Sequence, residues 1–236
     1  MFRETTEVIL VHQALRLGGV RAPITIEPLN ATGPQRFLQK LANGQATIMG
    51  ESLWLSDIER AGNQVTASSS IIADGRFLVG IYTHPNNQKA LQTKSLQDLK
   101  QLRFVSNRNW ANDWRTLESL EVKTLYSANY FKSMLHMVRA GRADALLSAF
   151  PSTHTLIREH EGNGLIPIAN IRIALRGSRH FAVSMSHSNS QRLFAALERG
   201  LTQLRQQGKI EQAYQESGFY HPATQNWPIL NNAHSQ

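Results

Sequence analysis

A helix that ends at a glycine and is followed by a short apolar run occurs twice in this chain, and this repetition constrains the fold most. Residues 134–150 read MLHMVRAGRADALLSAF. Their apolar residues are spaced for one buried helix face, and Gly141 supplies the left-handed conformation that ends a helix. Residues 37–49, FLQKLANGQATIM, repeat the pattern around Gly44. One copy would be an ordinary αβ unit, but two copies in a chain of this length indicate two similar lobes.

Helical and β-rich segments alternate along the rest of the chain, as is typical of an α/β sheet with covering helices. We expect helices over residues 8–17, 34–43, 96–99, 113–120, 128–140, 151–160, 190–206 and 210–216. We expect strands over residues 24–28, 46–50, 77–83, 102–105, 122–125, 143–147, 165–169 and 180–186. A strand normally precedes the first helix of such a sheet. Here that strand is either missing or supplied by residues 1–6.

Composition restricts the chemistry available to the chain. Its 236 residues can bury one large core or two small ones, and a hydrophobic content of 41% with 18% charged residues describes a globular protein. The absence of cysteine excludes disulfides, thiolate zinc sites and thiol nucleophiles. The sequence also carries no P-loop, G-x-S-x-G, H-E-x-x-H or G-x-G-x-x-G motif. We therefore expect no enzyme, no metal site and no cofactor.

The net charge of +8 suggests nucleic acid, an anionic membrane or an acidic small ligand as partner. The positive residues are scattered and form no basic run, so nucleic acid is not expected. No apolar stretch approaches the roughly 18 residues of a membrane span, so no membrane insertion is expected. No signal peptide precedes Phe2. Either the protein is cytoplasmic, or a leader is absent from this chain.

Five segments in order and spacing carry a resemblance to a known family. They are LANGQATIM with the following Arg60, DGRFLVGIYT, SLQDLKQLRFV, GRADALL and LERGLTQLRQQGKIEQAYQESGF. The chain resembles the family 3 solute-binding proteins, which have the type II periplasmic binding fold and include the binders of polar amino acids. The resemblance implies an α/β protein with two mixed sheets, flanking helices and two crossing strands. It implies one lobe of residues 1–83 plus 186–236 and a second lobe of residues 84–185.

The resemblance also implies a ligand site. Arg60 matches the arginine that holds the ligand α-carboxylate in amino-acid binders, and a guanidinium can grip a carboxylate bidentately. The other expected ligand-binding residues are Ser52, Trp54 and Ser69 in the first lobe and Asn107, Arg108 and Trp110 in the second. The alternatives are a solvated surface charge for Arg60, a plain loop for Ser68–Ser70 and a core role for Trp110 or Trp114.

One departure from the family pattern bears on the ligand. Amino-acid binders place an acidic residue after the GR-x-D strand start, where it pairs with the ligand ammonium. Counting from Asp144, that position is Ala149. An α-amino acid would leave its ammonium unpaired there, at a desolvation cost of about several kcal/mol. Standard amino-acid specificity is therefore not expected.

These observations predict a non-enzymatic, monomeric, periplasmic protein that closes on a small polar, anionic or carboxylate-bearing solute. It would serve ABC-type uptake with a membrane permease, or sensing. The alternatives are a ligand-sensing domain of a signalling protein and an enzyme on the same scaffold, because fold alone does not settle function.

Overall fold

The computed structural model describes residues 3–28, 34–160 and 163–231. The chain divides into two compact units, Met1–Ala73 with Gly177–Ser217 and Asp74–Arg176 with Gly218–Gln236. This division differs from the expected boundaries at 83/84 and 185/186. The chain passes between the units three times, because the segment after Ser217 returns to the second unit.

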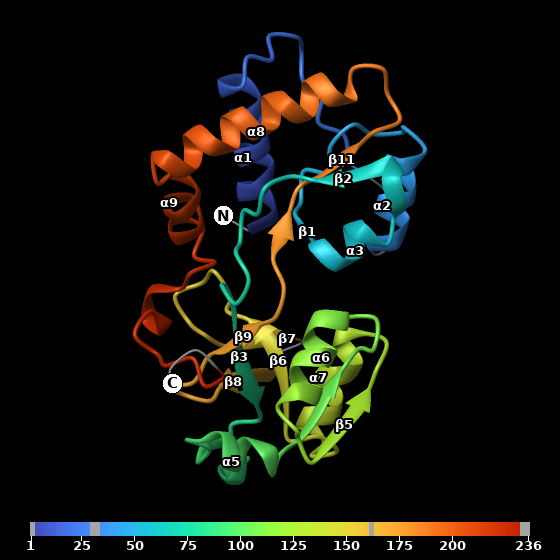
Figure 1. Cartoon of the computed structure of the whole chain (residues 1–236). Coiled ribbons are helices and arrows are strands. Elements are labelled where there is room, and N and C mark those ends of the chain that lie inside the picture. Colours follow the sequence, from blue (N-terminus) through green and yellow to red (C-terminus); the bar gives the residue numbers. More distant parts are fainter. Residues whose placement is uncertain (1–2, 29–33, 161–162, 232–236) are drawn as a thin grey trace. The chain divides into compact units, whose positions relative to one another are not determined.

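The first unit combines helices with short strands (Figure 1). Its elements are α1 (Arg3–Leu17), α2 (Pro34–Ala42), β1 (Leu53–Trp54), α3 (Leu55–Glu59), η1 (Gly62–Gln64), β2 (Val65–Ala67), β10 (Arg179–His180), β11 (Ala182–Ser184), α8 (Ser190–Gln206) and α9 (Lys209–Glu216). β1 pairs with β10 and β2 pairs with β11, both antiparallel. Leu38, Leu41, Ile58 and Val65 are buried together between α2, α3 and β2.

The expected mixed sheet of the first unit is reduced to these two pairs of strands within the described residues. The prediction of a strand over residues 24–28 is wrong, and prolines at both sides of this segment remove backbone donors. In the predicted strand 46–50, only Ile48 forms a bridge, to Val183. Residues 3–6 belong to α1, so they do not supply a preceding strand.

The second unit is built on a seven-stranded mixed sheet in the order β5-β4-β6-β3-β8-β7, with β9 also paired to β3. Its strands are β3 (Phe77–Thr83), β4 (Arg103–Ser106), β5 (Thr124–Ser127), β6 (Ala145–Ala149), β7 (Arg158–His160), β8 (Asn163–Pro167) and β9 (Ile173–Leu175). β4 runs parallel to β5 and β6, whereas β3 is antiparallel to β6, β8 and β9.

The helices of this unit are α4 (Gln88–Leu91), α5 (Leu96–Lys100), α6 (Ala111–Ser119), α7 (Phe131–Arg139) and η2 (Pro222–Thr224). Ser95 caps α5 in a capping box with Asp98, which explains why so short a helix begins where the sequence predicts. Met134, Leu135 and Val138 of α7 pack on the buried face of the sheet, and Gly141 follows with a φ of 67°. The helix–glycine–strand pattern is thus confirmed for residues 131–149.

Residues 151–160 do not form the predicted helix, and this prediction is wrong. Residues 158–160 are the strand β7, which pairs antiparallel with β8. The ladder offered by β8 satisfies backbone groups that a helix would otherwise pair internally.

The segment after Gly218, which has little pattern in sequence, is held to the second unit by aromatic and backbone contacts. The Phe219 and Phe77 rings pack edge to face with their centres 5.0 Å apart, and the Trp227 and Phe150 rings do so with their centres 5.9 Å apart. The Arg172 guanidinium donates to the Trp227 carbonyl at 2.7 Å. These contacts explain why residues 218–231 are not part of the first unit.

In the first unit, α1 packs against α8 through two glycines (Figure 1). A β-carbon on Gly200 would stand 1.8 Å from the Ala14 carbonyl oxygen, and one on Gly18 would stand 1.8 Å from that of Ala196. The two helix backbones therefore touch at both positions, and only glycine fits there.

We expect Gly200→Ala to destabilise the protein although alanine favours a helix by about 1 kcal/mol over glycine. The added methyl must separate α1 from α8, and overpacking of this kind costs about 1–3 kcal/mol. Urea denaturation measures the change, with exposed Gln206→Ala on α8 as the control. An unfolding free energy equal to or above that of the parent would show that the close approach is not needed.

Candidate functional site

A buried carboxylate fixes the loop that carries two of the predicted ligand-binding residues. Glu7 of α1 is fully buried. Its Oε2 accepts from the Ser52 backbone N–H at 2.8 Å, and its Oε1 accepts from the Ser52 hydroxyl at 2.8 Å. Arg3 donates to both carboxylate oxygens at 3.0 Å, and the Tyr214 hydroxyl of α9 donates to Oε1 at 2.9 Å. The Ser52 side chain is therefore occupied inside the protein.

The hydroxyl of Tyr214 is a proton donor in this cluster. Burial, and next the neighbouring Glu7 carboxylate, raise the pKa of Tyr214 well above its ordinary value. The phenol therefore stays protonated and can donate to Glu7. Three elements, α1, the 51–54 loop and α9, are joined at one carboxylate.

Arg179 of β10 completes the cluster from the other side of the loop. Its Nε donates to the Ser52 hydroxyl at 2.8 Å, and its Nη2 donates to the Ser52 carbonyl. Its guanidinium carbon lies 4.9 Å from the centre of the Trp54 ring. Glu51 lies 2.7 Å from Arg3 and 3.9 Å from Arg179, so two carboxylates face two guanidinium groups.

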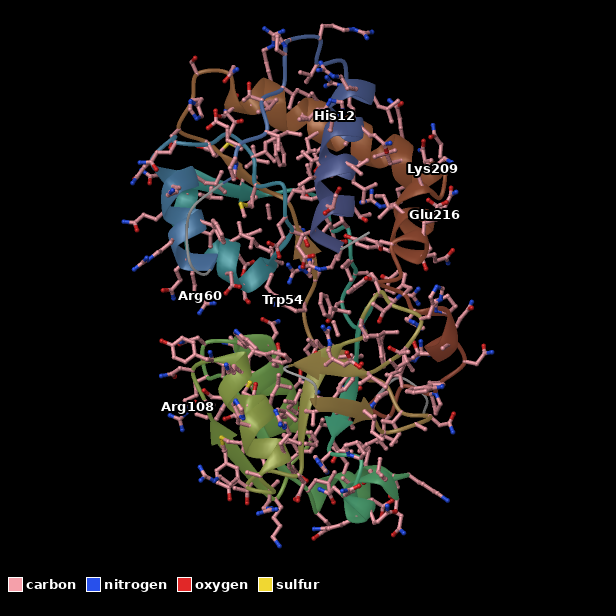
Figure 2. The ribbon with its side chains drawn as sticks, turned by 180° about the vertical axis from the view of Figure 1, so that it is seen from behind. His12, Trp54, Arg60, Arg108, Lys209 and Glu216 are labelled. Carbon is pink, nitrogen blue, oxygen red and sulfur yellow. The ribbon has the colours of Figure 1, made fainter. Side chains whose placement is uncertain are left out.

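Trp54 and Arg60 lie at the two ends of the short helix α3. Trp54 occupies the N-cap position and Arg60 the C-cap position. Both project from the same edge of the first unit (Figure 2). The Arg60 side chain is 57% exposed, and it pairs with Asp57 and donates to the Ser56 carbonyl at 3.0 Å. Trp54 is half-buried. These two side chains are thus the accessible part of the predicted site in this unit.

Ser69 forms hydrogen bonds with two side chains of α8. Its backbone N–H donates to Glu198 at 2.7 Å, and its hydroxyl accepts from Arg205 at 3.2 Å. Its neighbour Ser68 is buried, and the Ser68 carbonyl lies 2.6 Å from His180 Nδ1. The serine cluster therefore has structural contacts that its sequence does not reveal.

The predicted residues of the second unit lie in the loop between β4 and α6. Asn107 is buried, and it donates to the Asn129 carbonyl at 2.9 Å and accepts from the Asn109 N–H at 2.8 Å. The Arg108 guanidinium lies 5.1 Å from the centre of the Trp114 ring. Trp110 is 38% exposed, and its ring lies 6.3 Å from that of Phe131. Asn107 shapes the loop, whereas Arg108 and Trp110 are accessible.

A guanidinium lies at Ala149, the position where the family pattern has an acid. Arg158 donates to the Ala149 carbonyl through Nε at 3.1 Å and also through Nη2. The buried Tyr82 is close to it: burial raises the pKa of the Tyr82 hydroxyl, and Arg158 opposes that rise. This neutral and cationic surrounding does not suit a ligand ammonium.

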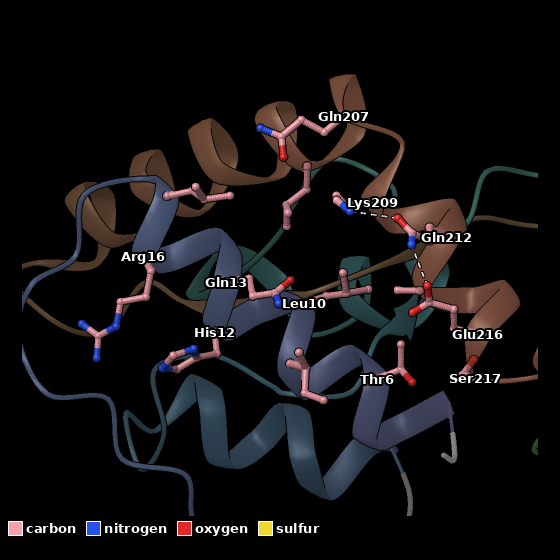
Figure 3. A pocket seen from close by; sticks show the side chains of 14 residues that line it. Thr6, Leu10, His12, Gln13, Arg16, Gln207, Lys209, Gln212, Glu216 and Ser217 are labelled. Atoms are coloured by element: carbon pink, nitrogen blue, oxygen red, sulfur yellow. Dashed lines mark hydrogen bonds between the residues drawn. The ribbon is translucent and has the colours of Figure 1, made fainter.

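A separate groove of about 690 Å³ lies in the first unit between α1, the end of α8 and α9 (Figure 3). Its apolar side chains are Ile9, Leu10, Leu17, Leu204 and Ala213. Lys209 donates to Gln212 at 3.0 Å, and Gln212 donates to Glu216 at 2.6 Å. These polar groups pair with one another along α9, and we assign no ligand to this groove.

Glu7, Arg179, Tyr214 and Arg158 are the residues that sequence reasoning missed. Only Glu7 gave a signal, because it is a lone acid on the buried face of α1. Arg179 and Tyr214 act through partners more than 100 residues away, and Arg158 binds a carbonyl nine residues before it. Among the described residues, no group of three or more histidine, aspartate or glutamate side chains could hold a metal ion. No helix in those ranges is long and apolar enough to cross a membrane.

We expect Glu7→Gln to lower the free energy of unfolding by about 3 kcal/mol, because it leaves half-buried Arg3 and buried Arg179 with one carboxylate fewer. Urea denaturation of the purified protein measures this. Glu4→Gln is the matched control, since Glu4 lies on the same helix and pairs with the same Arg3 but is 53% exposed. It should change stability by less than about 0.5 kcal/mol. Equal effects of the two substitutions would contradict the role of Glu7.

Comparison with known protein structures identifies the fold. No family model and no curated protein sequence matches the chain. Several solved structures do, with a probability of 1.00. The Bordetella pertussis BvgS periplasmic VFT2 domain superposes with a TM-score of 0.62 at 15% identity, over 88% of this chain and 82% of that one.

Two solute-binding proteins are also similar. The probable amino-acid ABC transporter extracellular-binding protein YtmK of Bacillus subtilis gives a TM-score of 0.63 at 15% identity, over 89% of this chain and 86% of that one. The substrate-binding protein AbpA of Streptococcus pneumoniae, bound to L-arginine, gives a TM-score of 0.56 at 13% identity, over 91% of this chain and 83% of that one. The chain therefore has the two-lobed α/β fold of the type II periplasmic binding proteins.

Proposed function

We propose that this chain binds a small polar solute that carries a carboxylate or another anionic group, without catalysing a reaction. It would act as a monomer in the periplasm and deliver the solute to an ABC-type membrane permease. The fold supports the general class, because similar structures include ABC transporter substrate-binding proteins. The charges at the predicted site support the finer assignment.

The observation that carries the proposal is the placement of guanidinium groups at the predicted site residues. Arg60 projects from the first unit beside Trp54, and Arg108 is exposed in the second unit. Arg158 binds the Ala149 carbonyl at the position where an acid would meet a ligand ammonium. A guanidinium donates well-directed paired hydrogen bonds to carboxylate or phosphate groups. Within each unit, these groups favour an anionic solute without an obligatory ammonium.

The same fold is compatible with two alternative functions. The chain could be a ligand-sensing domain that acts with a signalling protein, since the same capture of a solute serves transport and sensing alike. An enzyme on this scaffold is the third reading, and reproducible turnover of a substrate that one point mutation abolishes would establish it. Closure of the lobes on the solute also stays a prediction.

Arg60→Ala should weaken the best anionic ligand about ten- to hundredfold, because loss of one partner of a charge-assisted hydrogen bond costs about 1.5–3 kcal/mol. Isothermal titration calorimetry measures the affinity. The melting temperature of the empty protein should stay nearly unchanged, since the Arg60 side chain is 57% exposed.

Arg36→Ala, which changes an exposed arginine on α2 of the same unit, is the control and should bind like the parent. If Arg60→Ala also binds like the parent, Arg60 is a surface charge and the ligand lies elsewhere.

A further inference from the structure

The guanidinium of Arg179 gives the Trp54 ring a buried positive charge on one face. Arg179 is 7% exposed, and its guanidinium carbon stands 4.9 Å from the centre of the ring. Its hydrogen bonds to the hydroxyl and carbonyl of Ser52 hold the group in place. Burial, and next the charge of Arg3, lower the pKa of Arg179 to about 10, so the group remains charged at neutral pH.

The positive charge of Arg179 is balanced by the carboxylates of Glu7 and Glu51, but both carboxylates form ion pairs with Arg3. Glu7 accepts from Arg3, Ser52 and Tyr214, and Glu51 lies closer to Arg3 than to Arg179. The Arg179 guanidinium of this cluster is stacked on the indole of Trp54. A group that stacks on the other face of the ring therefore has the charge of Arg179 across the indole.

A cation on one face of an aromatic ring changes what the ring attracts. The negative face of an indole normally draws ammonium and guanidinium groups. When a guanidinium already occupies one side, a second cation across the ring meets a like charge within about 10 Å. At an effective dielectric constant near 20 the repulsion by Arg179 alone lowers affinity about tenfold, and an anion gains by a similar factor. The Glu51 carboxylate, 3.9 Å from Arg179, reduces both effects. Neutral planar groups keep their stacking contact.

We propose that Arg179 is a positioning residue that acts through Trp54 to determine ligand charge. It orients the ring, and its charge determines which chemical groups can stack on Trp54. Planar groups that are anionic or uncharged are accepted, whereas guanidinium and ammonium groups are rejected. This inference rests on the proposed function, because it takes Trp54 as a ligand contact. It adds the chemical class of the group that the first unit recognises.

Three probes of nearly equal shape test this selection. Benzoate, benzamide and benzamidinium are planar and differ mainly in charge. We expect the parent protein to bind benzoate at least about tenfold more tightly than benzamidinium in calorimetric titrations at low salt, with benzamide between them. Arg60→Ala should weaken benzoate but keep this order, because the charge beneath Trp54 remains.

Arg179→Gln removes the charge and keeps a planar amide that can donate to the Ser52 carbonyl. Because this leaves Glu51 with one partner fewer, the double variant Arg179→Gln/Glu51→Gln keeps the cluster neutral and gives a second route to a folded protein. The preference for benzoate over benzamidinium should fall about tenfold in either variant. The controls are Glu51→Gln alone and Arg199→Gln, an arginine of the same unit that donates to the Gly18 carbonyl. Arg199→Gln should keep the preference, and Glu51→Gln should keep or strengthen it, because it removes a carboxylate that opposes the charge of Arg179.

Each outcome decides a separate question. If the parent binds benzamidinium as tightly as benzoate, the selection by Arg179 is refuted whether or not any variant folds. An unchanged preference in a folded Arg179→Gln variant would refute it as well. Absence of benzoate binding to a parent that binds another anion would refute the planar contact at Trp54. If the parent binds no anionic solute at all, the proposed function fails instead.

Discussion

The carboxylate of Glu7 is the group on which the first unit depends. A buried carboxylate loses its hydration at a cost of about several kcal/mol, and only well-aligned donors offset this loss. Here Arg3, the N–H and hydroxyl of Ser52, and Tyr214 all donate to the same group. Because the donors come from α1, the 51–54 loop and α9, the charge ties together segments about 200 residues apart. The close contact of α1 with α8 at Gly200 fixes the same helix about two turns further along, at Ala14.

This cluster links the core of the unit to its accessible edge. Ser52 binds Glu7 with its hydroxyl and accepts Arg179 at its carbonyl, and Arg179 in turn covers one face of Trp54. Trp54 then begins α3, and Arg60 ends it. The predicted site residues Trp54 and Arg60 are therefore held by groups in the interior of the unit. A ring whose orientation is set before binding loses little conformational entropy when a ligand stacks on it.

Local patterns made much of the fold predictable. The spacing of Met134, Leu135 and Val138 and the glycine after them identified α7 and β6, and the β-rich run Phe77–Thr83 identified β3. The site was predictable only in part. Ser52 was expected to meet the ligand, yet its hydroxyl is bound by Glu7 and Arg179, which lie 45 and 127 residues away. The strand β7 was missed because its pairing with β8 overrides the local helical pattern. Long-range partners such as Glu7 and Arg179 leave no trace in the periodicity around Ser52.

A thermal-shift screen of the purified protein against organic acids, amino acids, amines and sugars tests the central claim most directly. A ligand that binds only the folded state raises the melting temperature in proportion to the logarithm of its concentration over its dissociation constant. We predict that carboxylate-bearing solutes without an ammonium group raise the melting temperature, and that L-arginine does not. A large shift with L-arginine or another cationic amino acid, and none with the anions, would contradict the account.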